Sequence, residues 1–157
     1  MKACVFSDSH GYAANMIAFI GIEKPDIVFF LGDGERDLLE VEERFPDLPI
    51  YAVRGNCDFR SELNTTLVCE VEGVTIYMTH GHTANVKYED RMDTLTMHAM
   101  QAGADIALFG HTHWQHLSEN RGVILLNPGS VGRGYLPGYA VLIIENGRVF
   151  PSLKGSG

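Results

Sequence analysis

Short, continuous apolar runs alternate with longer mixed segments in the first half of the chain. The runs cover residues 3–7, 27–31 and 50–53, and residues 13–23 and 38–45 between them place apolar side chains at helical spacing. Continuous apolar strands are typical of a sheet that is covered on both faces. Strands that alternate with helices pair in parallel through right-handed crossovers. The first half therefore predicts an α/β arrangement.

From residue 67 onward the pattern changes to that of antiparallel strands. Three pairs of strands are expected, each joined by a short polar turn: 67–71 with 74–79, 115–118 with 123–126, and 140–145 with 149–153. The last pair is joined through Asn146-Gly147, a strong hairpin signal. A helix over residues 91–102 and a buried strand over 106–109 follow the first pair. We expect a single α/β domain over residues 1–154, followed by a flexible tail at 155–157.

Length, charge and cysteine content limit the classes of function. The 157 residues correspond to about one domain, and 45% hydrophobic with 20% charged residues is typical of a globular chain. Twelve basic against twenty acidic side chains give a formal net charge of -8, which argues against a nucleic acid polymer as partner. The three cysteines form no CxxC pair, and no apolar run is long enough for a signal peptide or membrane span. We expect a cytoplasmic protein that does not bind membranes, and a homo-oligomer remains open.

Metal-binding residue types follow several of the predicted strands. The seven candidate donors are Asp8, His10, Asp33, Asn56, His80, His111 and His113. Open α/β sheets place their ligand sites at the carboxyl ends of strands, so these donors are expected to converge. Most of them are flanked by glycines, which let the backbone approach an ion closely: Gly11, Gly32, Gly34, Gly55, Gly81 and Gly110.

The number of donors predicts more than one metal ion. Seven N or O donors exceed what one tetrahedral zinc needs, whereas two ions that share the carboxylate of Asp33 would use them all and leave positions for water and substrate. A closed structural zinc site would more often use thiolates, and only Cys57 lies among the donors. The sequence therefore favours an open, hydrolytic two-metal site.

The segments FSDSHG, GDG, GNCD, THGH and GHTH, in this order, resemble the signature of calcineurin-like metallophosphoesterases. The NPGS segment at 127–130 is similar to one in the short single-domain phosphodiesterases of that superfamily. The resemblance implies a four-layer sandwich of two mixed β-sheets flanked by helices. It also implies a ligand set in which Asp8, His10 and His113 hold one ion, Asn56, His80 and His111 hold the second, and Asp33 bridges them. Manganese is the favoured ion, with iron, zinc or nickel as alternatives.

These observations predict a phosphodiesterase that hydrolyses a small phosphodiester. A hydroxide that bridges the two ions would attack phosphorus, with Asp33 and Asn56 as catalytic-site residues. His82, Cys57 and Asp58 are candidates for supporting the ligands or contacting the substrate. In many family members a histidine that assists the leaving group follows the metal-bound asparagine, but here that residue is Cys57. Because a neutral thiol is a poor proton donor, ordinary phosphomonoesters, which have alkoxide leaving groups, should be cleaved less well than diesters with acidic leaving groups.

Two other interpretations remain open. The first is a phosphomonoesterase or nucleotide pyrophosphatase, which a substrate panel would separate from a phosphodiesterase. The second is a non-enzymatic, metal-binding interaction scaffold, as in the retromer subunit that resembles this fold. Loss of metal ligands would have favoured the scaffold, and no ligand is missing here. Substrate specificity is expected to depend on the loops at residues 83–90 and 133–138.

Overall fold

The computed structural model of the chain describes residues 1–132 and 136–155. The elements follow in the order β1 (Lys2–Phe6), α1 (Ala13–Glu23), β2 (Ile27–Phe30), α2 (Asp37–Arg44), β3 (Ile50–Ala52), β4 (Thr66–Val71), β5 (Val74–Thr79), η1 (His82–Ala84), α3 (Asp93–Gln101), β6 (Ile106–Leu108), β7 (Gln115–Asn120), β8 (Val123–Pro128), β9 (Tyr139–Glu145) and β10 (Arg148–Lys154). Part of the loop expected at 133–138, and the end of the tail expected at 155–157, lie outside the described residues. None of the described helices has the length and apolar character needed to cross a membrane.

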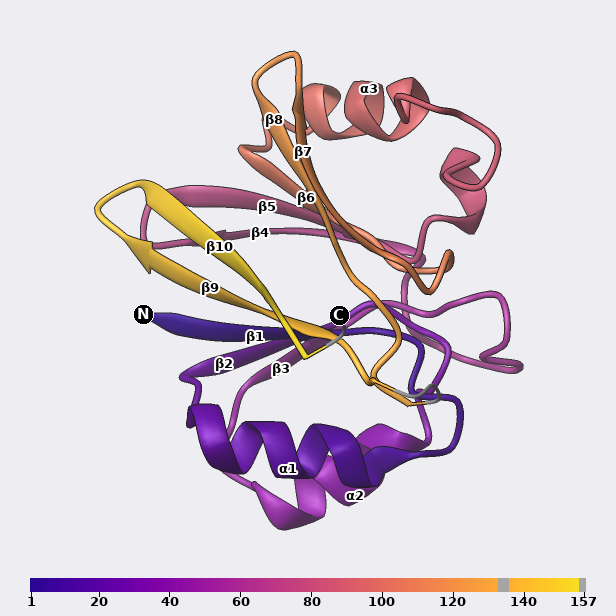
Figure 1. Ribbon diagram of the computed structural model, residues 1–157, viewed down its shortest axis with the longest axis vertical. Coiled ribbons are helices and arrows are strands. Elements are labelled where there is room, and N and C mark those ends of the chain that lie inside the picture. The colour runs from indigo at the N-terminus through magenta and orange to yellow at the C-terminus, as the bar shows by residue number, and fades with distance from the viewer. Residues whose placement is uncertain (133–135, 156–157) are drawn as a thin grey trace.

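The strands form two mixed sheets of five strands each, in the orders β10-β9-β1-β2-β3 and β4-β5-β6-β8-β7. In the first sheet β1, β2 and β3 are parallel, and β9 and β10 join them as an antiparallel extension. In the second, β5, β6 and β8 are parallel, with β4 and β7 as antiparallel edges. Figure 1 shows four layers: α1 with α2, the first sheet, the second sheet, and α3. The four-layer sandwich that the resemblance implied is confirmed.

Three hydrophobic clusters fill the spaces between these layers. Along β1, Ala3 and Val5 belong to the cluster between the two sheets. Cys4 and Phe6 belong to a second cluster, beneath α1 and α2. A third cluster joins Leu95 and other residues of α3 to the outer face of the second sheet. Alternate side chains of one continuous apolar run therefore pack into two different clusters, as expected of a strand that is covered on both faces.

Several element boundaries differ from the sequence-based prediction by one or two residues, and two of these differences have a clear structural cause. The helix expected from residue 91 begins at Asp93, because Met92 has left-handed backbone (φ 51°) and packs its side chain inside. Strand β7 continues through Asn120, which had been expected in the turn. The Asn120 amide donates hydrogen bonds to the Arg91 carbonyl and to Asp93 Oδ1, both at 3.0 Å, and so fastens β7 to the start of α3.

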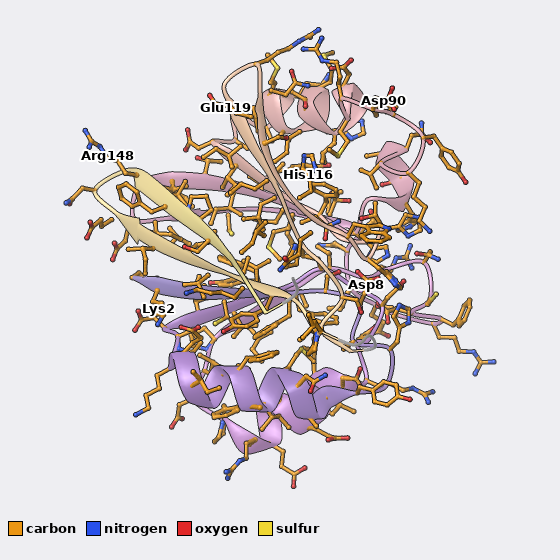
Figure 2. All side chains as sticks on the ribbon, viewed as in Figure 1. Lys2, Asp8, Asp90, His116, Glu119 and Arg148 are labelled. Atoms are coloured by element: carbon orange, nitrogen blue, oxygen red, sulfur yellow. The ribbon has the colours of Figure 1, made fainter. Side chains whose placement is uncertain are left out.

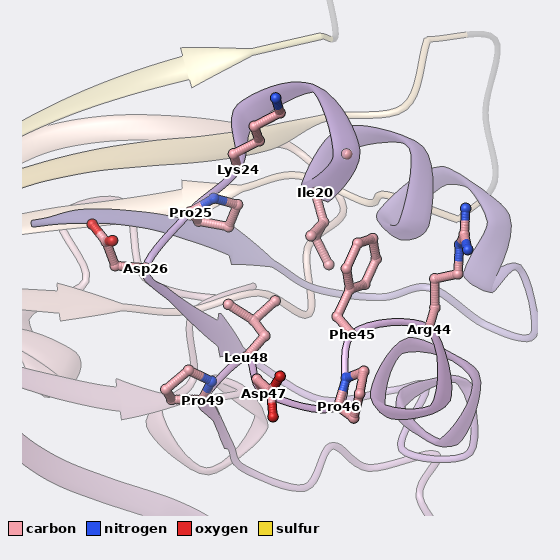
Figure 3. Close-up of a pocket in the computed structure, with 11 residues that line it drawn as sticks. Ile20, Lys24, Pro25, Asp26, Arg44, Phe45, Pro46, Asp47, Leu48 and Pro49 are labelled. Carbon is pink, nitrogen blue, oxygen red and sulfur yellow. The ribbon is translucent and has the colours of Figure 1, made fainter.

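The two ends of the sandwich differ in character. The loops that follow β1, β2, β5 and β6 gather at one end, where Figure 2 places Asp8, while Lys2 lies at the opposite end of β1. A cavity of about 550 Å³ lies near the start of β2 and β3, lined among others by Ile20, Phe45 and Leu48 (Figure 3). None of the potential metal-binding groups found among the described residues lies there. The chemistry therefore concentrates at the carboxyl ends of the parallel strands.

Replacing Phe29 by alanine should destabilise the protein strongly. Phe29, in β2, is fully buried between the sheets, and loss of such a ring leaves a cavity that costs about 3–5 kcal/mol of unfolding free energy. Phe150→Ala, at a half-exposed position of β10, is the matched control and should cost much less. Urea unfolding followed by circular dichroism measures both variants. Equal losses would contradict the packing of the two sheets through Phe29.

Candidate metal centre

Six of the seven predicted donors meet in two groups of potential metal ligands. The first group is Asp8, His10 and His113, and the second is Asp33, His80 and His111. Within each group the ligand atoms all lie within 4.8 Å of one another. The donors come from the loops after β1, β2, β5 and β6, so both sheets contribute.

The two groups adjoin each other through the carboxylates of Asp8 and Asp33. Asp8 Oδ1 lies 3.1 Å from His113 Nε2 in its own group and 3.8 Å from His80 Nε2 in the other. Asp33 Oδ2 lies 3.1 Å from His80 Nε2 and 3.7 Å from His10 Nε2. The donors therefore form one continuous cluster in which a carboxylate of each group faces an imidazole of the other.

Two buried atoms of this cluster have no hydrogen-bond partner within the described chain, namely Asp8 Oδ1 and His80 Nε2. The other oxygen of Asp8 accepts hydrogen bonds from Ser7 Oγ at 2.5 Å and from the His111 backbone N–H at 3.1 Å. His80 Nδ1 donates to the Leu31 carbonyl at 2.7 Å, which leaves Nε2 as its free nitrogen. Buried polar atoms without partners are costly and mark a missing ion or water. Carboxylate and imidazole donors in this arrangement fit divalent metal ions.

The charges within the cluster are mutually stabilised. Burial alone would raise the pKa of Asp8, but the neighbouring rings of His10 and His113 hold it well below its ordinary value. Burial likewise opposes ionisation of Asp33, and the contact with His80 lowers its pKa overall. Burial, followed by the nearby charge of His80, lowers the pKa of His111 to about 4. At neutral pH both carboxylates are therefore ionised and His111 is neutral, which are the forms that bind metal.

Five of the donor residues have left-handed backbone, with φ values of 57° for Asp8, 45° for His10, 61° for Asp33, 70° for His111 and 65° for His113. Asp and His tolerate this region better than most residues, but it still has to be held in place by the surroundings. Ser130 Oγ donates to the Asp8 carbonyl at 2.7 Å. The Asn127 amide donates to the Gly110 carbonyl at 3.0 Å and to Thr112 Oγ1 at 2.9 Å. The NPGS segment thus supports the loops that carry the donors.

Asp58 holds two of these loops together. Its Oδ1 accepts hydrogen bonds from the backbone N–H groups of Gly34 at 2.9 Å and Glu35 at 3.0 Å. Its Oδ2 accepts from those of Asp33 and Gly55, both at 2.8 Å. A side chain at position 55 would collide with Asp33, so glycine permits this close approach. The carboxylate of Asp58 is engaged by four backbone donors, which gives it a positioning role.

Asp37 performs a similar task that sequence reasoning missed. The buried carboxylate at the start of α2 accepts hydrogen bonds from Ser9 Oγ at 2.5 Å and from the Gly11 backbone N–H at 2.9 Å. It thereby ties α2 to the loop that carries Asp8 and His10. An acidic residue in the first turn of a helix is common, so the sequence offers no signal that separates Asp37 from an ordinary helix start.

The loop after β3 places Asn56 and Cys57 at the exposed rim of the cluster. The Cys57 backbone N–H donates to Asp33 Oδ1 at 2.7 Å, and the Asn56 amide lies 3.6 Å from the Cys57 sulfur. That sulfur forms a third group of potential ligands with His10 and Asp33. Burial, followed by the charge of Asp33, raises the pKa of the Cys57 thiol, so it is neutral at pH 7 and a poor ligand or nucleophile.

His82 lies beside the second group of donors. Its ring centroid is 5.6 Å from that of His80 and 6.2 Å from that of His111. Its Nδ1 is buried and has no hydrogen-bond partner among the described residues. Burial, followed by the charge of His80, lowers its pKa, which makes it a neutral imidazole at pH 7. It remains a candidate for supporting a ligand or contacting substrate.

Comparison with known proteins assigns this arrangement to a family. A family model described as the calcineurin-like phosphoesterase superfamily domain matches residues 1–147. The chain belongs to this superfamily. The probable metallophosphoesterase YsnB of Bacillus subtilis (strain 168) is 34% identical over 155 residues, covering 93% of this chain and 86% of that protein. Phosphodiesterase MJ0936 of Methanocaldococcus jannaschii is 26% identical over 155 residues, covering 88% of each.

Solved structures of similar fold extend the comparison. A conserved uncharacterized protein of Streptococcus pneumoniae TIGR4, described as a predicted phosphoesterase, superimposes with a TM-score of 0.80 at 29% identity, covering 98% of this chain and 88% of that one. Vps29 of Entamoeba histolytica, complexed with Zn²⁺, superimposes with a TM-score of 0.78 at 21% identity, covering 99% of each. The second likeness shows a shared fold alone.

Asp33→Asn should lower the pKa of His80 in the metal-free protein. Burial disfavours the charged ring, but the carboxylates of Asp33 and Asp8 and the Leu31 carbonyl together outweigh burial, so the pKa of His80 lies above 6.5. A raised pKa means that protonated His80 stabilises the fold at low pH and that this contribution is lost as the pH rises through the folded pKa. The neutral amide of the variant would remove the largest of the influences that raise the pKa of His80. NMR titration of the ring protons measures the change, with His116 as an internal control. An unchanged pKa of His80 would show that Asp33 does not stabilise its protonated ring.

Proposed function

We propose that this protein is a metal-dependent phosphodiesterase that hydrolyses a small phosphodiester at a two-metal centre. The observation that carries the proposal is the pair of adjoining ligand groups, with Asp8 Oδ1 and His80 Nε2 buried and without hydrogen-bond partners among the described residues. Membership of the calcineurin-like phosphoesterase superfamily supports the reaction class. The similarity to a named phosphodiesterase supports diesters as substrates.

The donors would divide between two ions. Asp8, His10 and His113 would hold the first, while His80, His111 and Asn56 would hold the second, with Asp33 shared. Two divalent ions, with manganese favoured and iron, zinc or nickel as alternatives, would supply the positive charge that activates water and neutralises the phosphate. The donors are carboxylates, imidazoles and one amide, a set that suits several of these metals.

The chain's own residues give the cluster a closed side and an open side. The side chains of Asp8 and Asp33 are 0% and 3% exposed, whereas those of His10 and His113 are 27% and 49% exposed. A substrate would therefore approach past the two histidines, while the carboxylates stay shielded from water. Shielding strengthens the electrostatic interactions of the buried pair with any cation and with the imidazoles.

The residues at the rim favour a diester over a monoester. Cys57 stands where a proton donor would assist an alkoxide leaving group, and its thiol is neutral with a raised pKa. Leaving groups that need no protonation are therefore preferred. The formal net charge of -8 opposes binding of a nucleic acid polymer. The three cysteines are free thiols, which fits the reducing cytoplasm.

The central test is hydrolysis of bis-p-nitrophenyl phosphate beside p-nitrophenyl phosphate. Chelator-treated protein should be inactive, and added Mn²⁺ should restore cleavage, chiefly of the diester. Asp33→Ala should lose at least about 100-fold of this activity because it removes the shared carboxylate. Asp47→Ala, at an exposed position outside the ligand groups, is the matched control. No turnover with any divalent ion would favour the interaction scaffold, whose support is the likeness in fold to Vps29.

Cys57→His should shift the balance of activities toward monoesters. The imidazole would add a proton donor beside the leaving oxygen, and general acids contribute large factors where the leaving group is an alkoxide. We expect kcat/KM for an alkyl phosphate monoester, divided by kcat/KM for bis-p-nitrophenyl phosphate, to rise at least about tenfold. Cys57→Ala removes the thiol without adding a donor and should leave the ratio near that of the wild type. An equal ratio in all three proteins would exclude a role of position 57 in leaving-group chemistry.

A further inference from the structure

A second cavity, of about 380 Å³, opens beside the candidate metal centre. Two candidate ligands, His10 and Asp33, form part of its lining, together with Arg36 and Phe59, which the centre itself does not use. Small-molecule sites typically have volumes of about 300–1,000 Å³, so this cavity suits one small organic group. A phosphate at the metal centre would therefore lie next to this space, which has room for one of its ester groups.

The two unassigned residues present flat surfaces that nothing in the described chain covers. The Phe59 side chain is 86% exposed. Arg36 is exposed too, and its guanidinium forms no hydrogen bond or ion pair with any residue that the structure describes. Phenyl rings and guanidinium planes both stack on planar aromatic groups, including the bases of nucleosides.

The charges of the lining select against an anionic group. Four acidic residues line the cavity against one arginine: Asp33, Glu35, Asp37 and Asp58. Asp58 is engaged by four backbone donors, and Asp37 by Ser9 and Gly11. A second phosphate would be repelled by this set, whereas a neutral planar ring would not. The lining therefore fits a neutral aromatic group better than a charged one.

The same hydrogen bonds fix the two walls relative to each other. Arg36 directly follows Glu35, whose backbone N–H donates to Asp58. Phe59 directly follows Asp58 itself. One carboxylate thus anchors the backbone on both sides of the cavity, so the backbone that carries Arg36 and Phe59 is fixed before a ligand arrives. Such preorganisation reduces the entropy lost on binding.

We propose that this cavity binds the base of a nucleoside, and that the preferred substrates are phosphodiesters with a nucleoside on one side. The proposal rests on the proposed function, because it needs the phosphate at the metal centre. Hydrolysis would add water across the bond between phosphorus and the leaving oxygen. The products would be a nucleoside monophosphate and the leaving alcohol, which takes up the proton. The base would stack on Phe59, with Arg36 beside it.

The test compares two diesters that share one leaving group, thymidine 5′-(p-nitrophenyl phosphate) and ethyl p-nitrophenyl phosphate. Because the bond that breaks is the same, the ratio of their kcat/KM values reports on the cavity. We expect a preference of at least about fivefold for the thymidine ester, seen mainly in KM. Phe59→Ala should abolish most of this preference, and Phe59→Tyr should retain it. Phe150→Ala, at the opposite edge of the sheet from β3, is the matched control.

A binding measurement separates failure of this proposal from failure of the proposed function. Saturation-transfer NMR with thymidine on the metal-free protein should give signals on the base protons that Phe59→Ala removes and Phe59→Tyr keeps. If both esters are cleaved with equal kcat/KM, the base site is excluded and the phosphodiesterase stands. If neither ester is cleaved with any divalent ion, the proposed function fails. In that case a saturation-transfer signal from thymidine that depends on Phe59 still supports the base site. Absence of the signal excludes the base site.

Discussion

The hydrogen bond from the His80 ring to the Leu31 carbonyl is the contact on which the centre depends. It is buried, 2.7 Å long, and connects the second sheet to the first. Because a carbonyl can only accept, Nδ1 must carry a proton, and Nε2 is left to face Asp8 and Asp33 at 3.8 and 3.1 Å. A single backbone oxygen therefore sets the orientation of the ring toward both carboxylates. The centre exists only when the two sheets are packed together, so folding and site assembly are the same event.

Much of the fold follows from local pattern, but its layering does not. The apolar run of β1 and the turn at Asn146-Gly147 are local signals, and the corresponding elements lie where the sequence predicted them. The division into two sheets depends on contacts between distant segments, such as β1 with β9. No periodicity encodes that pairing, and it was available only through the resemblance to a family. The start of α3 was misjudged because the left-handed backbone of Met92 is set by burial of its side chain.

The convergence of the candidate donors was predictable because each follows a strand and has a metal-binding side chain, and six of the seven meet in the two groups of potential ligands. The residues that hold them in place were harder to find. Asp37 resembles an ordinary first-turn acid, and its contacts with Ser9 and Gly11 cross 28 and 26 residues. The four backbone donors around Asp58 have no side-chain signature at all. Sequence reveals the groups that do chemistry more readily than those that position them, because only the former are restricted to a few residue types.

The loops of the centre are fastened by side chains that bind no metal in the proposed arrangement, namely Asp37, Asp58, Asn127 and Ser130. Their anchoring does not pass through the histidines, so the loss of an imidazole at the open side removes a donor without releasing a loop. Over evolutionary time a descendant that loses such a donor can therefore still inherit the same rigid surface. Selection can then act on that surface independently of any metal bound beside it.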